Sequence, residues 1–268
     1  MHDATTLTTL LKTASLSELL AGASASVKAR PDDNGCRHAL IGLYCLDGQW
    51  EKALMQLQTL ALLDNAQQKQ SELYKNLILS ELIREEVLAG KRVPNLFTGP
   101  VPEWMTLLQQ ANKAQAEHAT AHAETLRQQA FALAPESAGS GEITGEFGWI
   151  ADSDGRIGPA CEFISAGGYR QVPFSSLQLL NVRRPRTLFD LIWTPAHIKI
   201  DGQFHYGYVP ARYPLTAEAA QHEKLGLRTE WRQVSATLTT GTGRKVVLTD
   251  SREFSLLEIV EIHFAQGE

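Results

Sequence analysis

The hydrophobic periodicity of the chain changes once, and this change most constrains the fold. Residues 1–135 repeat apolar side chains at the three- and four-residue spacing of amphipathic helices, whereas residues 142–268 carry short apolar runs rich in aromatic and β-branched side chains. Between them, APESAGSGE concentrates Pro, Ser and Gly, which disfavour the interiors of helices and sheets. The sequence predicts an α+β chain with a helical domain over 1–135, a linker over about 136–141 and a β domain over 142–268.

The first half is predicted to contain six helices joined by short connections. Ser17 can cap the first helix, Pro31 ends it, and Gly90 can adopt a left-handed conformation after the longest one. The predicted helices cover residues 17–30, 33–46, 50–63, 67–88, 103–114 and 117–133. Each has an apolar stripe too small to fold alone, so we expect them to stack as an irregular α-solenoid of tetratricopeptide type.

The stretch LYCLDGQWEKAL, residues 43–54, contains the clearest turn between two of these helices. Gly48 permits a sharp reversal of the chain because it lacks a Cβ atom. Trp50 is expected to pack back over the turn, and the small Ala53 lets the second helix approach the first.

The second half is predicted to form many short strands. They cover residues 146–151, 160–165, 169–173, 177–182, 191–200, 203–210, 228–234, 245–249 and 257–264. The pair Asp201-Gly202 is the strongest hairpin signal in the chain, and Gly241 and Gly243 mark another predicted reversal. Short strands with frequent turns indicate a small antiparallel β barrel or sandwich.

Charge and hydropathy argue against several classes of partner. The formal charge of −5 and the isoelectric point of about 5.9 disfavour nucleic acid and anionic membranes. No apolar run approaches the roughly 18–20 residues that a membrane helix needs, and the N-terminus lacks the features of a secretory signal. The three cysteines, Cys36, Cys45 and Cys161, match no zinc or redox spacing and predict buried or half-buried thiols in a reducing cytoplasm.

His118 and His122 could hold a metal, because residues four apart on a helix share one face, but an exposed polar helix face is the favoured interpretation. No glutamate stands between them as in zinc proteases, and no third ligand is evident. Asp152 and Asp154 begin like a calcium loop but lack its later ligands, so a polar turn is predicted. No cofactor is expected. A metal-dependent hydrolase using the two histidines and a self-associating structural assembly protein stay as alternatives to a binding protein.

Six segments, in order over nearly the whole chain, carry a family resemblance. They are residues 30–64 (RPDDNGCRHALIGLYCLDGQWEKALMQLQTLALLD), 96–108 (LFTGPVPEWMTLL), 147–174 (FGWIADSDGRIGPACEFISAGGYRQVPF), 190–198 (DLIWTPAHI), 211–214 (ARYP) and 228–231 (RTEW). Together they are similar to the ImpE/SciE family, also called TagJ, of accessory proteins of bacterial type VI secretion.

The resemblance implies a cytoplasmic protein without catalytic activity. It implies binding to an N-terminal helical segment of TssB, the small subunit of the contractile sheath. It also implies a link to the AAA+ unfoldase ClpV, which recycles contracted sheath. The family has no catalytic residues to transfer to this sequence.

A stacked helical array has a concave groove lined by the first helix of each pair, and such grooves can bind a helix. We therefore expect partner contacts from the helix over 33–46 and, near the end of the array, from the helix that begins at Glu103. The candidate residues are His38, Gly42, Cys45, Met105, Leu108, Asn112 and Gln115. Core packing is the competing explanation for Cys45 and Leu108. The β domain could instead dock the unfoldase or a second copy of the chain.

Overall fold

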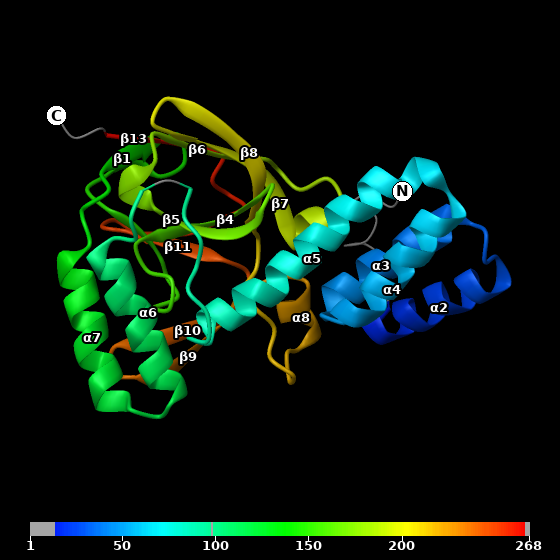
Figure 1. The fold of residues 1–268 in the computed structure, drawn as a ribbon, viewed down its shortest axis with the longest axis horizontal. Helices are drawn as coiled ribbons and strands as arrows, with labels where there is room; N and C mark the ends of the chain where they lie inside the picture. The colour runs from blue at the N-terminus through cyan, green and yellow to red at the C-terminus, as the bar shows by residue number, and fades with distance from the viewer. Residues whose placement is uncertain (1–13, 98, 266–268) are drawn as a thin grey trace.

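The computed structural model describes residues 14–97 and 99–265, in which long helices come first and strands follow (Figure 1). The long helices are α2 (Leu16–Ala29), α3 (Asn34–Asp47), α4 (Trp50–Leu63), α5 (Gln68–Leu88), α6 (Glu103–Ala116) and α7 (Thr120–Leu133). None of the helices in these residues is long and apolar enough to cross a bilayer. The predicted α+β class is confirmed.

The helix ends are set by side chains close in sequence. Ser15 accepts a hydrogen bond from the backbone N–H of Glu18, whose carboxylate accepts one from the backbone N–H of Ser15. This capping box starts α2 two residues before the predicted cap. Gly48 ends α3 with a φ of 76°, and α4 begins at Trp50, as the turn signal predicted. Gly90 follows α5 with a φ of 71°.

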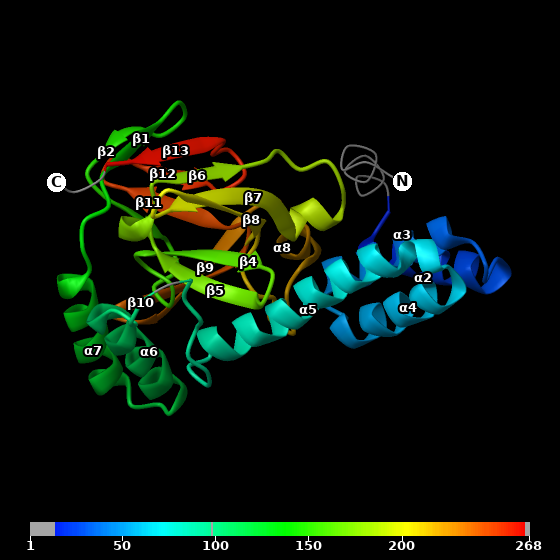
Figure 2. The ribbon, with the colours of Figure 1, turned by 45° about the horizontal axis from the view of Figure 1, so that its top comes forward.

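Helices α2, α3, α4 and the first half of α5 pack together at one end of the molecule (Figure 2). Helix α5 continues toward the other end, where α6 and α7 form a separate pair beside the strands (Figure 1). A Cβ atom on Gly90 would lie 2.4 Å from the backbone nitrogen of Lys113, so the end of α5 abuts α6. The helices therefore form two groups joined by α5 rather than one continuous stack.

Within the described residues the strands form three antiparallel sheets. They are β1 (Gly139–Gly141), β2 (Gly145–Phe147), β3 (Ile150–Asp152), β4 (Ala160–Ser165), β5 (Gly168–Pro173), β6 (Leu179–Val182), β7 (Trp193–Ile200), β8 (Gln203–Pro210), β9 (Thr229–Ser235), β10 (Leu238–Gly243), β11 (Val246–Thr249), β12 (Glu253–Ser255) and β13 (Glu261–Phe264). The largest sheet has the order β2-β1-β13-β6-β7-β8-β4-β5, and the smaller ones are β12-β11-β3 and β10-β9. Strands β2 and β5 end the large sheet in the described residues, so it is not the closed barrel that was one of the two predictions.

Glycines account for two strands that the sequence did not predict. Strand β1 lies in the segment predicted to be a linker, and it pairs with β13. A Cβ atom on Gly139 or Gly141 would lie within 2.6 Å of a backbone oxygen of β13, so only glycine fits there. Gly241 and Gly243 lie inside β10 rather than in a turn. The ring of Tyr213 lies against the backbone of Gly241, where a Cβ atom would not fit.

The division into two domains stays a prediction.

One apolar core joins the helices to the sheet. Ile41 and Leu46 of α3 and Leu77 of α5 belong to the same buried cluster as Ile164 of β4 and Trp193 of β7. Because these residues come from both halves of the chain, the helical group depends on the β part for much of its core.

Candidate functional site

The structure corrects the predicted groove on α3. Gly42 is buried, and a Cβ atom there would lie 3.3 Å from the side chain of Leu188 and 3.6 Å from that of Phe189. Cys45 is also buried, and its carbonyl accepts a hydrogen bond from Arg212 at 2.8 Å. Residues of the same chain therefore cover this face of α3, which leaves no room for a partner at either position.

The four candidates at the α6 end are buried or half-buried: Met105, Leu108, Asn112 and Gln115. Met105 and Leu108 belong to an apolar cluster that includes Tyr213 of the β part. The side chain of Asn112 donates to the backbone oxygen of Arg156 at 3.0 Å and accepts from Arg127 at 3.1 Å. This face of α6 packs inward, so core packing is the correct explanation for Leu108 as it is for Cys45.

The paired-histidine geometry is not formed. Helix α7 begins at Thr120, so His118 lies in the turn before it, with a φ of 62°. His122 is in the first turn of α7, and both residues are exposed. The two rings therefore do not occupy successive turns of one helix. The described part of the chain contains no group of three or more His, Cys, Asp or Glu side chains that could hold a metal ion.

An open groove lies next to the remaining candidate, His38. It has a volume of about 720 Å³ and is formed by α2, α3, the start of α5 and the segment that leads into the short helix η3 (Phe189–Leu191). We call it the α2–α5 groove. Its apolar lining includes Leu19, Ala23, Leu43, Tyr74 and Phe189.

Aromatic stacking builds the floor of the α2–α5 groove. The rings of Tyr74 and Phe189 are 3.9 Å apart and nearly parallel, with an interplanar angle of 18°. Burial raises the pKa of the Tyr74 hydroxyl, so this side chain is neutral at physiological pH. His38 makes a hydrogen bond of 2.9 Å with Gln67, the residue just before α5. Polar and apolar groups from three parts of the chain thus meet in one concavity.

Charged groups lie at one end of the α2–α5 groove, where α2 is followed by α3. Arg30 forms an ion pair of 3.0 Å with Asp33, and its guanidinium also lies 3.0 Å from the sulfur of Cys36. Asp33 caps α3 by accepting from the backbone N–H of Cys36, and this bond lowers the pKa of its carboxyl group. An apolar floor with a few polar groups at its rim is typical of a ligand or peptide site.

A second feature, a buried cluster of charges, joins α5 to the β part. Arg84 forms ion pairs of 2.7 Å with Glu81 on its own helix and with Glu162 on β4. Lys245 contacts Glu162 and Asp152. Each charge has an opposite partner, so the cluster holds the fold together and leaves no free group for chemistry.

Sequence reasoning missed both the aromatic floor and this cluster. The residues of the floor, Tyr74 and Phe189, come from distant parts of the chain and share no motif. A signal for the charge cluster does exist, because Glu81 and Arg84 lie among the apolar positions Leu77, Ile78 and Val87 of α5. Charges on the apolar face of a helix indicate buried partners elsewhere in the chain.

Known proteins resemble this chain in both sequence and fold. The model of the family described as ImpE protein matches residues 144–263. A Pseudomonas aeruginosa protein named type VI secretion system accessory component TagJ is 35% identical over 260 residues, which cover 95% of this chain and 89% of that protein. The crystal structure of protein VPA1032 from Vibrio parahaemolyticus has the same fold, with a TM-score of 0.86 and 24% identity over 94% of each chain. This chain belongs to the ImpE family.

Proposed function

We propose that this chain is an accessory component of a bacterial type VI secretion system and that its α2–α5 groove binds an N-terminal helical segment of the sheath small subunit TssB. The relative named TagJ, which is similar over 95% of this chain, supports the secretion role. The observation that supports the site is the open apolar groove, because the other predicted contact positions are covered by the chain itself.

The chemistry of the α2–α5 groove suits an amphipathic helix. Such a helix would place its apolar face against Leu19, Tyr74 and Phe189, and the apolar anchors would supply most of the affinity. Arg30 and Asp33 at one end would fix the register, since charges at a rim favour orientation over affinity. His38 and Gln67 add hydrogen-bonding groups along one wall.

This function requires no bond to be made or broken, so we propose that the protein is not an enzyme. The rival metal-dependent hydrolase would need His118 and His122 on one helical face, and the turn before Thr120 separates them. We also propose that the protein acts in the cytoplasm. In support, Cys36, Cys45 and Cys161 are all free thiols, as is usual in a reducing compartment.

A link to the unfoldase ClpV is the least direct part of the proposal, because only the family resemblance supports it. It is tested by passing purified ClpV over the immobilised full-length chain, with and without TssB. Retention of ClpV on the immobilised chain, alone or only when TssB is present, would support the link. Flow-through of ClpV both with and without TssB would contradict it.

The groove is tested by titrating a fluorescent peptide from the N-terminus of TssB into the full-length chain. We expect saturable anisotropy with a dissociation constant in the micromolar range, about 1–100 µM. Ala23→Trp would fill the groove and weaken binding at least about tenfold. Ala25→Trp makes the same change on an exposed position of α2 outside the groove and should bind like the unmodified chain. No saturable binding, or equal binding by both variants, would contradict the proposal.

A further inference from the structure

Strands β9 and β10 form a two-stranded ribbon whose outer edge is free. Within the described residues β9 pairs only with β10, so the backbone groups on its other side have no strand partner. Residues 230–234 of β9 are all exposed. Exposed edge strands of this length are templates for pairing with another chain.

The ribbon is anchored to the rest of the molecule through β10. The backbone oxygen of Thr239 accepts a hydrogen bond of 3.0 Å from Gly155, and the backbone N–H of Gly241 donates to Asp154. On the inner face, Trp231 packs against Tyr213 with ring centroids 5.7 Å apart. The edge of β9 is therefore held in a fixed position while its own hydrogen-bonding groups face outward.

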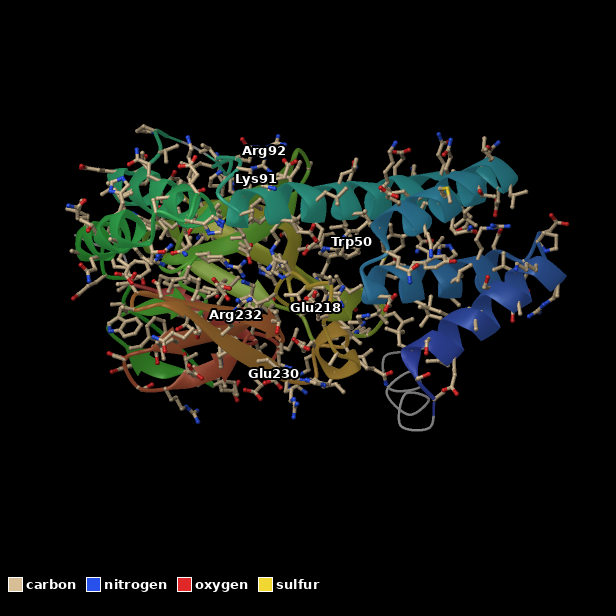
Figure 3. The ribbon with its side chains drawn as sticks, turned by 90° about the horizontal axis from the view of Figure 1, so that it is seen from below. Trp50, Lys91, Arg92, Glu218, Glu230 and Arg232 are labelled. Atoms are coloured by element: carbon tan, nitrogen blue, oxygen red, sulfur yellow. The ribbon has the colours of Figure 1, made fainter. Side chains whose placement is uncertain are left out.

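The outer face of β9 carries opposite charges two residues apart. Glu230 and Arg232 lie on the face opposite to Trp231, because side chains alternate along a strand. Figure 3 labels both residues on this part of the molecule. Glu230 forms an ion pair of 2.7 Å with Arg228. Arg232 has no carboxylate partner among the described residues, although its side chain is exposed beside a free edge.

We propose that β9 pairs edge to edge with β9 of a second copy of this chain, antiparallel and about a twofold axis at Trp231. A symmetric antiparallel pair is centred on a residue, since opposed side chains point to the same face. Centring on Trp231 places Glu230 of each copy opposite Arg232 of the other, so the dimer contains two such pairs. Centring on Glu230 or on Arg232 instead places two like charges opposite each other.

In the register centred on Trp231, Glu230 and Arg232 therefore supply all the opposed charge pairs between the two copies. It joins two ribbons into one four-stranded sheet and gives Arg232 the carboxylate that it lacks in one copy. The contact is isologous and closes after two copies, so it forms a dimer and not a fibre.

The dimer is tested by sedimentation velocity of the full-length chain across a range of concentrations. We expect a reversible monomer–dimer equilibrium. Glu230→Arg places arginines of the two copies opposite each other, and Arg232→Glu does the same with glutamates. Each variant alone should therefore dimerise at least about tenfold more weakly. A mixture of the two variants restores every opposed pair to opposite charge and should dimerise as the unmodified chain does.

Glu218→Arg is the matched control, because it makes the same charge change at an exposed position outside β9 (Figure 3). It should leave the equilibrium unchanged. Far-ultraviolet circular dichroism checks that each variant is folded. Recovery of dimerisation in the mixture of Glu230→Arg and Arg232→Glu shows independently that these two are folded. A monomer at every concentration would overturn the proposal and leave the edge for a strand of another protein. A dimer that both single variants retain would also overturn it, because the contact would then lie elsewhere.

Discussion

Arg84 donates hydrogen bonds to both carboxylate oxygens of Glu162, from Nε at 2.7 Å and from Nη2 at 2.8 Å, and both side chains are buried. The two residues are 78 positions apart in the chain and connect α5 to β4. Tyr169 adds a third hydrogen bond to the same carboxylate at 2.6 Å. This bidentate pair fixes the long helix, and with it one wall of the α2–α5 groove, relative to the sheet.

Replacing Glu162 by Gln should strongly destabilise the protein. The change removes the carboxylate shared by Arg84 and Lys245, so each buried cation keeps only one carboxylate partner, Glu81 or Asp152. Breaking buried ion pairs in this way costs about 3–5 kcal/mol. Urea unfolding followed by tryptophan fluorescence measures the loss. Glu72→Gln is the matched control, because its ion pair with Lys75 is half exposed, and it should cost about 1 kcal/mol or less. Similar costs for the two variants would show that the buried pair adds nothing.

The same carboxyl group should contribute to acid sensitivity. Burial alone would raise the pKa of Glu162, but the adjacent Arg84 and Lys245 outweigh burial and hold this pKa well below the usual 4.5. A folded-state pKa below the unfolded one stabilises the protein above about pH 4.5, and this contribution is lost as the pH falls below that value.

The free energy of unfolding, measured in urea from pH 7 to pH 3, should therefore fall below about pH 4.5. The Glu162→Gln variant should lose less over the same interval, because it lacks the titrating group. If the free energy of unfolding fell equally with pH in the two proteins, Glu162 would not be a source of the acid sensitivity.

Local signals predicted the elements well where sequence neighbours determine them. The turn at Gly48 and the hairpin at Asp201 and Gly202 are confirmed, and the two hairpin residues have φ angles of 48° and 76°. The glycine-rich strands β1 and β10 were missed, because the same composition is typical of linkers and turns. There, glycine serves the close approach of another segment, and that requirement depends on contacts distant in sequence.

The candidate site was harder to predict than the fold. Periodicity identified α3 as a helix of the binding array, and His38 does line the α2–α5 groove. It could not show that Leu188 and Phe189, far later in the chain, cover α3 at Gly42, or that Arg212 binds the carbonyl of Cys45. A helical pattern shows which side chains share a face, but not which segment of the chain covers that face.

Thiol reactivity should separate the three cysteines. Burial raises the pKa of the Cys45 thiol and raises that of Cys161 to about 12, so neither forms the reactive thiolate at pH 8. Cys36 is only partly buried and lines the α2–α5 groove. Titration with Ellman's reagent should give one fast thiol in the folded protein and three in guanidinium chloride. Cys36→Ser should abolish the fast reaction, and a fast thiol that persists in this variant would contradict the burial of the other two.

Gly90 should tolerate alanine far less well than Gly99, although both have positive φ angles, of 71° and 76°. A Cβ atom on Gly90 would lie 2.4 Å from the backbone nitrogen of Lys113, whereas nothing lies within 4 Å at Gly99. Gly99→Ala should therefore cost only the backbone strain, about 1 kcal/mol. Gly90→Ala adds the displacement of α6 from the end of α5, for a total of about 2–4 kcal/mol.

Urea unfolding of the two variants beside the unmodified protein measures this difference in the free energy of unfolding. Because the two substitutions are chemically identical and share the strain of a positive φ, their difference isolates the contact between α5 and α6. A loss at Gly90 no larger than at Gly99 would show that α6 can move away from α5 at little cost. In that case the rigid placement of α6 beside the end of the long helix would not hold in solution.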